Sequence, residues 1–387
     1  KLKRLGINIA DTSIDFTGIK KHQQQIVKVA ALGAHKMLVD AQVETKQGTG
    51  EIISSQEVQY RDQQGNSKIS LTKNIIIAWG SEPQMLPEVK LSERILTSDG
   101  LLNLNILPAS IIIVGGSVVG VEFATFFAEL GVKVTLIELL DRILPYEDQE
   151  AVDLLRQELI RLGIDIHTST KLEKLKDTGS AVTMQAQQNN NKLEMTADYV
   201  LLCTGREPLI HGEELKKLGI EYAKTGIKVD KSMMTNVAGI YAVGDVTGGL
   251  MLAHRATEQG KVAAGHICES NTIVYNENFI PSVVYSHPQI ARVGYNQKQA
   301  ANEGLIVEIV KSNYSANIIA RTELMGQGFV KAIFHENIIK GATIVGDDAA
   351  DLIAPLSLAI SNGLTKKQLQ SWVIPHPTLS EIFVPLI

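Results

Sequence analysis

The chain has 387 residues, of which 44% are hydrophobic and 20% charged, and its formal net charge is −5. This composition is ordinary for a soluble globular protein and excludes a disordered chain or a coiled coil. The net negative charge does not indicate a basic surface that would bind nucleic acid. No apolar run reaches the roughly 18 residues of a membrane helix. The length predicts two or three domains of roughly 150 residues each, with neither nucleic acid nor a membrane as a partner.

The two cysteines, Cys203 and Cys268, are far apart in the sequence. They form neither a disulfide framework nor a metal cluster and fit a reducing cytosol, so we expect a cytoplasmic protein with no metal. Both are predicted to be small buried hydrophobic residues. No signal peptide is evident at the start. The chain opens with Lys1 rather than Met, which we interpret as a processed start or the tail of a longer protein.

The first part of the chain is predicted to form a helix and then a meander of strands. Between residues 18 and 40, apolar side chains recur near the helical period of 3.6. From Val43 to Gly80, short strand-like segments alternate with Asp, Gln, Gly and Asn. The last of these segments, residues 75–78, is apolar throughout, which predicts a strand buried on both faces.

A βαβ unit is predicted next, because a buried strand, a glycine turn, a helix and another strand follow within about 30 residues. These elements lie at residues 111–114, 115–120, 121–130 and 132–138. Further elements are a helix at 148–162, strands at 165–168, 181–187 and 199–203, and a polar hairpin loop at 188–192. After a segment at 239–245 and a long helix, residues 277–387 alternate strands and helices as an α+β unit. Its strands are expected at 282–285, 306–311, 329–334 and 341–346, and its helices at 297–304, 349–362 and 365–372.

The glycine turn has the chemistry of a phosphate-binding loop. Gly115, Gly116 and Gly120 permit a tight turn, a close approach of the backbone to a pyrophosphate and close helix packing. The helix amides then face the anion. Glu138 ends the next strand, near the spacing of about 20 residues expected for a ribose-binding carboxylate, and its charge favours NAD over NADP. The alternative is a nucleotide-free turn with an incidental Glu, because Ser117 replaces the second glycine of the motif.

A family resemblance extends nearly end to end. The segments that carry it are NIIIAWGSEP, IIIVGGSVVGVEFA, VTLIELLDRILP, GIYAVGDVTGGLMLAHRATEQG, IPSVVYSHPQIARVG and HPTLSE. The chain resembles the dihydrolipoamide dehydrogenases, within the flavin disulfide oxidoreductases. That resemblance implies an α/β protein with Rossmann-like FAD- and NAD-binding domains and a C-terminal α+β dimerisation domain.

The resemblance also implies a layout and an activity. Residues 1–83 are the later part of the FAD domain, 84–207 the NAD domain, 208–276 a return to the FAD domain, and 277–387 the dimerisation domain. Family members are homodimers that pass electrons from dihydrolipoamide through a redox disulfide and FAD to NAD. Their implied partners are the lipoyl domains of 2-oxo acid dehydrogenase complexes.

Two family features are missing from the sequence, namely an N-terminal GxGxxG that holds the FAD pyrophosphate and a C-x4-C disulfide. We therefore expect the chain to lack roughly the first βαβ unit and the loop and helix after it, and not to oxidise dihydrolipoamide by itself. The competing hypothesis is a non-catalytic homologue that keeps a dinucleotide fold and a dimer interface. Trp79 also stands where the family usually has Thr, and its size disfavours the usual flavin pose.

By resemblance, the flavin-binding positions are Gly50, Gly80, Ser81, Asp245, Met251, Leu252, Ala253 and His254. For Asp245 the alternative is a helix N-cap. Leu172 and Gly205 match positions that meet NAD, although Leu172 also fits a plain core residue. The resemblance points Glu122 toward the flavin, beside a Lys that this chain lacks. Glu122 is therefore expected to be partly buried, with a raised pKa.

The C-terminal segment carries the predicted acid–base group. A histidine is suited to general base catalysis near neutral pH, and an adjacent carboxylate orients it. The resemblance assigns these roles to His376 and Glu381, acting on the partner subunit's thiol. The alternative is that Thr378-x-x-Glu381 is a capping box that serves only a helix start.

Overall fold

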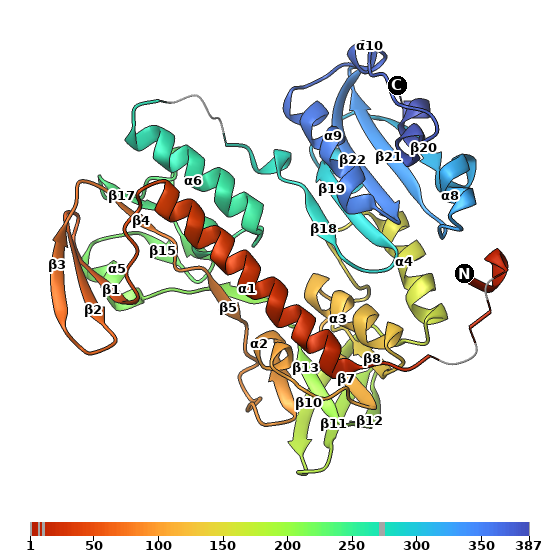
Figure 1. The fold of residues 1–387 in the computed structure, drawn as a ribbon, viewed down its shortest axis with the longest axis horizontal. Coiled ribbons are helices and arrows are strands. Elements are labelled where there is room, and N and C mark those ends of the chain that lie inside the picture. Colours follow the sequence, from red (N-terminus) through yellow and green to blue (C-terminus); the bar gives the residue numbers. More distant parts are fainter. Residues whose placement is uncertain (1, 7, 10–11, 271–274, 387) are drawn as a thin grey trace. The chain divides into compact units, whose positions relative to one another are not determined.

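The computed structural model describes residues 2–6, 8–9, 12–270 and 275–386 (Figure 1). The chain divides into two compact units. Unit 1 comprises Lys1–Ser13, Met85–Gly205 and Asn276–Ile387, and unit 2 comprises Ile14–Gln84 and Arg206–Tyr275. In the described part of the chain, no helix is both long enough and apolar enough to cross a membrane.

The first part of unit 1 is built on a parallel five-stranded sheet in the order β6-β13-β7-β8-β9. Its strands are β6 (Ile95–Thr97), β13 (Tyr199–Leu202), β7 (Ser110–Val114), β8 (Lys133–Ile137) and β9 (Asp165–His167). Its helices are α2 (Ser98–Leu102), α3 (Val118–Glu129) and α4 (Gln149–Arg161). The apolar run of β7 is buried on both faces of the sheet, as expected for a central parallel strand. Glycines with positive φ follow α3 and α4, at Gly131 and Gly163.

An antiparallel sheet, β10-β11-β12, is inserted before β13. Its strands are β10 (Thr170–Asp177), β11 (Val182–Gln188) and β12 (Asn191–Ala197). The turn between the last two strands has only two residues, Asn189 and Asn190, with φ of 47° and 69°. Positive φ at both positions is typical of a type I′ hairpin turn. The hairpin prediction is confirmed, but the predicted loop at 188–192 is too long, because pairing continues into it at both ends.

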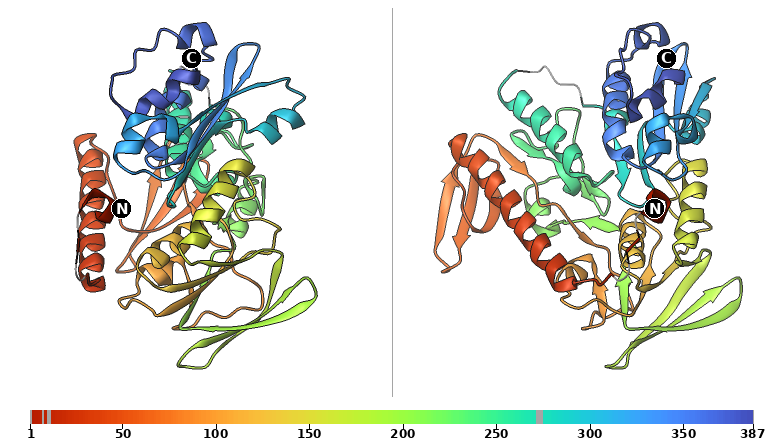
Figure 2. Two further views of the ribbon diagram at one scale, coloured as in Figure 1. Left: turned by 90° about the vertical axis from the view of Figure 1, so that its right-hand side faces the viewer. Right: turned by 45° about the vertical axis from the view of Figure 1, so that its right-hand side comes forward.

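The C-terminal part of unit 1 is an antiparallel sheet in the order β18-β19-β22-β21-β20, with α9 across one face (Figures 1 and 2). Its strands are β18 (Ser282–Val284), β19 (Gln289–Gly294), β20 (Glu308–Asn313), β21 (Phe329–His335) and β22 (Ile338–Gly346). Its helices are α7 (Gln297–Asn302), α8 (Ile318–Thr322), α9 (Ala349–Ser361) and α10 (Lys366–Leu369). The 3-10 helix η5 (Leu379–Leu386) buries Ile382, Phe383 and Leu386 in the same core.

The described part of unit 2 contains three α-helices, a three-stranded meander and three pairs of short strands. Its helices are α1 (Phe16–Asp40), α5 (Gly212–Lys217) and α6 (Ala253–Ile267). The meander is β1 (Gly48–Ser54), β2 (Glu57–Asp62) and β3 (Ser67–Leu71). The paired strands are β4 (Ile75–Ile77) with β17 (Ile240–Ala242), β5 (Ser81–Pro83) with β14 (Arg206–Pro208), and β15 (Tyr222–Ala223) with β16 (Gly226–Ile227).

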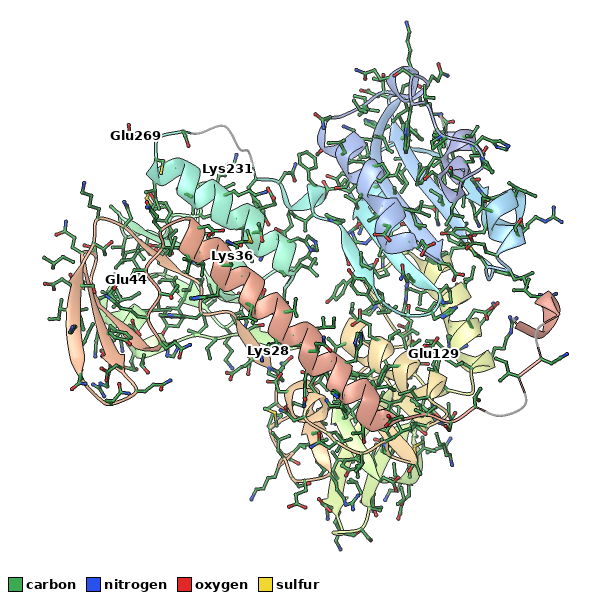
Figure 3. All side chains as sticks on the ribbon, in the orientation of Figure 1. Lys28, Lys36, Glu44, Glu129, Lys231 and Glu269 are labelled. Carbon is green, nitrogen blue, oxygen red and sulfur yellow. The ribbon has the colours of Figure 1, made fainter. Side chains whose placement is uncertain are left out.

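Two predictions of burial are wrong in the described structure. Ile76 is 43% exposed, because Ile75 and Ile77 on either side of it face the core of unit 2 and Ile76 therefore points to the opposite face of β4. Cys268 is exposed at the C-cap of α6, whereas Cys203 is buried as predicted. Helix α1 likewise buries no residue of its own, and Figure 3 labels Lys28 and Lys36 on it. Burial is thus set by which elements meet, beyond what an apolar run by itself dictates.

Candidate functional site

The glycine turn after β7 is closed so tightly that two of its positions must be glycine. Gly115 has φ of +112°, and a Cβ there would lie 2.2 Å from the carbonyl oxygen of Cys203. A Cβ on Gly120 would lie 1.9 Å from the carbonyl oxygen of Gly115. The turn therefore delivers the chain to the start of α3, where the first amides of a helix lack intrahelical partners.

Ser117, which departs from the glycine pattern, is the N-cap of α3. Its Oγ accepts a hydrogen bond from the amide of Gly120 (3.3 Å) and donates to the carbonyl oxygen of Cys203 (2.9 Å). Serine is among the preferred N-cap residues for this reason. The side chain thus joins the turn to the end of β13, so Ser117 fits the turn without the second glycine.

Glu138 is 9% exposed. Each of its carboxylate oxygens accepts a hydrogen bond from a backbone amide. Oε2 accepts from Gly116 (2.6 Å) and Oε1 from Leu140 (2.7 Å). The carboxylate is therefore a structural part of the turn, while its contact with a ribose stays a prediction. An ionised carboxylate has about four acceptor positions, so two remain for hydroxyl groups. The residues present fit a dinucleotide at this turn.

The remaining residues predicted for this nucleotide site have defined places in the fold. Leu172, on β10, is partly buried against the core that contains Ile112 and Val114, so the alternative of a core residue has packing support. Gly205 has φ of +121° beyond β13, a backbone conformation that favours glycine. Contacts of Leu172 and Gly205 with NAD stay predictions.

Glu122 lies on α3 and accepts a hydrogen bond from the amide of Tyr285 (2.8 Å), just after β18. Burial raises the pKa of this half-buried carboxyl above its usual value, while the Tyr285 amide opposes the rise. The expected upward shift is confirmed. Desolvation disfavours the charged form of a carboxyl group, so Glu122 takes up a proton more readily than an exposed glutamate does.

In unit 2, Asp245 follows β17 and accepts a hydrogen bond from Oγ of Ser81 (2.6 Å). Ser81 in turn accepts from Nε of Arg206 (2.8 Å), whose Nη2 also donates to the Ser81 carbonyl oxygen. The 3-10 helix Gly244–Thr247 has Val243 as its N-cap, without a side-chain cap. The N-cap alternative for Asp245 is therefore wrong, and its carboxylate belongs to a polar cluster with Ser81 and Arg206.

Trp79 does not extend from this cluster into solvent. Its ring packs on the core that includes Ile75 and Ile77, and it meets the His211 ring edge-on at 4.5 Å. Gly80, next to it, has φ of +80°, which favours glycine. The core of unit 2 thus accommodates the indole, and the structure gives the predicted displacement of a flavin no separate support.

The other predicted flavin positions lie in ordinary surroundings. A Cβ on Gly50 would make only ordinary van der Waals contact, so the fold of unit 2 does not require glycine there. Met251 and Leu252 are partly exposed before α6, and Ala253 and His254 are exposed in its first turn. Contact of these residues with a flavin stays a prediction.

His376 and Glu381 form a hydrogen-bonded pair, here called the dyad. Nδ1 of His376 lies 2.8 Å from Oε1 of Glu381, and Oε2 accepts from the amide of Thr378 (3.0 Å). These bonds, that from His376 first, hold the pKa of Glu381 below its usual value. Because an ionised carboxylate only accepts, Nδ1 carries a proton and Nε2 is left as the basic nitrogen. The Thr378 hydroxyl donates to Pro375 instead of capping a helix, so only half of the predicted capping box forms.

Sequence reasoning missed two buried ion pairs that join the segment before α4 to the C-terminal sheet. Nε of Arg292 lies 2.9 Å from Glu147, and Nζ of Lys331 lies 2.8 Å from Asp148. All four side chains are less than 10% exposed. A charged residue within an otherwise apolar strand, such as Lys331 in β21, is the signal that could have revealed them, because buried charges need partners.

A parallel sheet with a dinucleotide-type glycine turn, followed by an antiparallel sheet and a C-terminal segment with a histidine–carboxylate dyad, defines the class as an oxidoreductase-like α/β protein. Residues 11–260 match the family described as pyridine nucleotide-disulphide oxidoreductase, and residues 280–387 match its dimerisation domain. The chain belongs to this family of pyridine nucleotide-disulphide oxidoreductases.

Relatives and solved structures agree with this assignment. A dihydrolipoyl dehydrogenase of Bacillus subtilis (strain 168) is 36% identical over 384 residues, which cover 98% of this chain and 81% of the relative. One from Geobacillus stearothermophilus is 35% identical with the same coverage. Among structures, LpdA from Mycobacterium tuberculosis has a TM-score of 0.92 at 26% identity, covering 99% of this chain and 84% of that one.

Proposed function

We propose that the chain serves as a dihydrolipoyl dehydrogenase, in which electrons from protein-bound dihydrolipoamide pass through a disulfide and FAD to NAD. The observation that supports this most is the dyad, with Nδ1 of His376 at 2.8 Å from Glu381. A carboxylate that fixes the imidazole leaves Nε2 ready to move a proton. In this role His376 takes the proton from a thiol of the partner subunit, and Glu381 stabilises the imidazolium that results.

FAD and NAD are the proposed cofactors, and when bound they supply the hydride and electron chemistry that protein side chains lack. Residues Gly115–Gly120 and Glu138 would hold NAD, with the carboxylate on the ribose hydroxyls. Ser81 and Asp245 would meet the flavin. The chain's own contribution is to bind and orient these groups and to hold the proton at His376.

The proposed assembly is a homodimer, which the match to a dimerisation domain supports. Isologous two-fold pairing is the commonest arrangement of homo-oligomers. Lipoyl domains of 2-oxo acid dehydrogenase complexes are the proposed protein partners. Light scattering at micromolar concentration is expected to give twice the mass of one chain, and a monomer would remove the basis for a dyad that acts across subunits.

A second candidate is a non-catalytic homologue, and the cysteines are the observation that favours it. Cys203 is buried, which raises the pKa of its thiol to about 12, whereas Cys268 is exposed. Both are free cysteines. A thiol reacts as its thiolate, so Cys203 is inert at neutral pH, and the 387 residues offer no dithiol pair.

One assay separates the two candidates. The 387-residue chain is compared with a chimera that adds the fifth of the Bacillus subtilis relative that this chain does not match. We expect NADH formation from dihydrolipoamide only in the chimera, together with flavin absorbance, and its loss with His376→Gln. A flavin-loaded chimera without activity would favour the non-catalytic homologue. Turnover by the 387-residue chain itself would require a different electron path.

A further inference from the structure

A buried asparagine lies behind the dyad loop, defined here as residues 375–381. Asn317 is 6% exposed and is the N-cap of α8, where its Oδ1 accepts from the amide of Ala320 (3.0 Å). Its Nδ2 donates to the carbonyl oxygens of Thr378 (3.1 Å) and Leu379 (3.2 Å). The side-chain oxygen of Asn317 thus accepts a hydrogen bond from α8, while its side-chain amino group donates to two successive carbonyl oxygens of the loop.

The backbone that presents Asn317 is itself firmly placed. Its amide donates to the carbonyl oxygen of Tyr314 (2.9 Å), and Tyr314 is 1% exposed, with its hydroxyl donating to the carbonyl oxygen of Asp347 (2.7 Å). A Cβ on Gly346 would lie 2.4 Å from this ring, so the tyrosine fills its space closely. Asn317 is therefore a fixed point to which the loop is attached.

The loop needs such an attachment because the dyad depends on its shape. The carboxylate of Glu381 accepts hydrogen bonds from both the Thr378 amide and Nδ1 of His376. Thr378 is thus held on its carbonyl side by Asn317 and on its amide side by Glu381. The side chain of His376 is 75% exposed, so it has little packing of its own and its orientation depends on Glu381.

We propose that Asn317 is a positioning residue for the dyad: its amide clamps two carbonyl groups of the loop and so keeps Glu381 in reach of both His376 and the Thr378 amide. This inference rests on the proposed function of the dyad for its significance. An amide suits the task because it caps α8 and donates at the same time. A carboxylate there would still cap the helix but would face the two carbonyl oxygens with negative charge.

The test compares Asn317→Asp with Asn296→Asp in the 387-residue chain. Asn296 is a matched control, because it is also 6% exposed, caps α7 by accepting from Gln299 (2.8 Å) and donates to a carbonyl, that of Tyr146 (3.3 Å). Hydrogen exchange followed by mass spectrometry is expected to show roughly ten- to thirtyfold faster exchange over residues 375–381 in Asn317→Asp, as two lost hydrogen bonds imply. The control variant is expected to leave this segment unchanged.

A second readout reports on the dyad and not on stability alone. The bonds from His376 and Thr378 lower the pKa of Glu381, so the titration midpoint of its carboxyl, followed by carbon-13 NMR and assigned with Glu381→Gln, is expected to rise in Asn317→Asp. If that variant does not fold, Asn317→Ser, which keeps a capping oxygen and lacks the amide donors, serves in its place.

An unchanged Glu381 titration in a variant whose loop exchanges faster would overturn the positioning role, as would equal effects of both Asp variants. Neither measurement needs FAD, NAD or turnover. If the chimera proved inactive while Asn317→Asp still shifted the Glu381 titration, the proposed function would fail and the inference about Asn317 would stand. An active chimera with an unmoved titration would give the reverse result.

Discussion

Replacing Glu138 by Gln is expected to destabilise unit 1 and to weaken the discrimination against NADP. The carboxylate accepts hydrogen bonds from the buried amide of Gly116 and from the amide of Leu140, which is partly buried, whereas a glutamine has only one acceptor oxygen. One amide then faces the side-chain amino group without a partner. Leaving a buried donor unsatisfied costs about 1–3 kcal/mol, and Glu138→Ala, which orphans both amides, is expected to cost about 2–5 kcal/mol.

Calorimetry of the nucleotide-free chain checks the stability. At about 2–4 °C per kcal/mol for a unit of this size, Glu138→Gln lowers the transition of unit 1 by about 2–12 °C, while Glu173→Gln, an exposed glutamate on β10, leaves it unchanged. Titration calorimetry with NAD and NADP then measures the preference, which the lost negative charge narrows. An unchanged transition, or equal binding of both nucleotides to the unmodified chain, would refute the role given to Glu138.

Three further results are expected. Burial raises the pKa of Glu122 in the folded state, so its contribution to stability is full below the ordinary glutamate pKa and is lost as the pH rises through the higher folded pKa. Glu122→Gln is expected to remove this decrease from the dependence of the melting temperature on pH. An unaltered pH dependence would contradict the raised pKa. Ser81→Ala removes the donor to Asp245 and lowers the free energy of unfolding of unit 2, measured in urea, by about 1–2 kcal/mol; an unchanged value would contradict a stabilising role of the cluster. Gly115→Ala places a Cβ against a carbonyl oxygen and costs at least about 3 kcal/mol, so near-normal melting would show that the turn can relax.

Features set by local chemistry were predictable from the sequence. The strand β7, the glycine turn and the helix α3 follow one another as expected, because the apolar run and the turn residues each favour one backbone conformation. The conformation of the Asn189–Asn190 turn is also local, although its length was overestimated.

Features that depend on the neighbours of a segment were not predictable. Ile76 belongs to as apolar a run as β7 does, yet it is exposed, because its neighbours Ile75 and Ile77 face the core of unit 2 and successive side chains of a strand point to opposite faces. Strand β19 was not predicted, and it begins directly after Pro288, a residue that is rare inside sheets. The bond between Asn317 and the dyad loop joins positions about 60 residues apart, and no periodicity or spacing in the sequence reports such a contact.

The contrast between the two cysteines has a practical consequence. Cys203 is buried directly after β13, whereas Cys268 is exposed at the C-cap of α6. A maleimide or iodoacetamide reagent at neutral pH is therefore expected to modify the native chain at Cys268 only. A spin label or fluorophore attached there needs no prior mutagenesis. Pairs of labelled subunits would then report the distance between their α6 ends, which gives spectroscopy a direct view of assembly in solution.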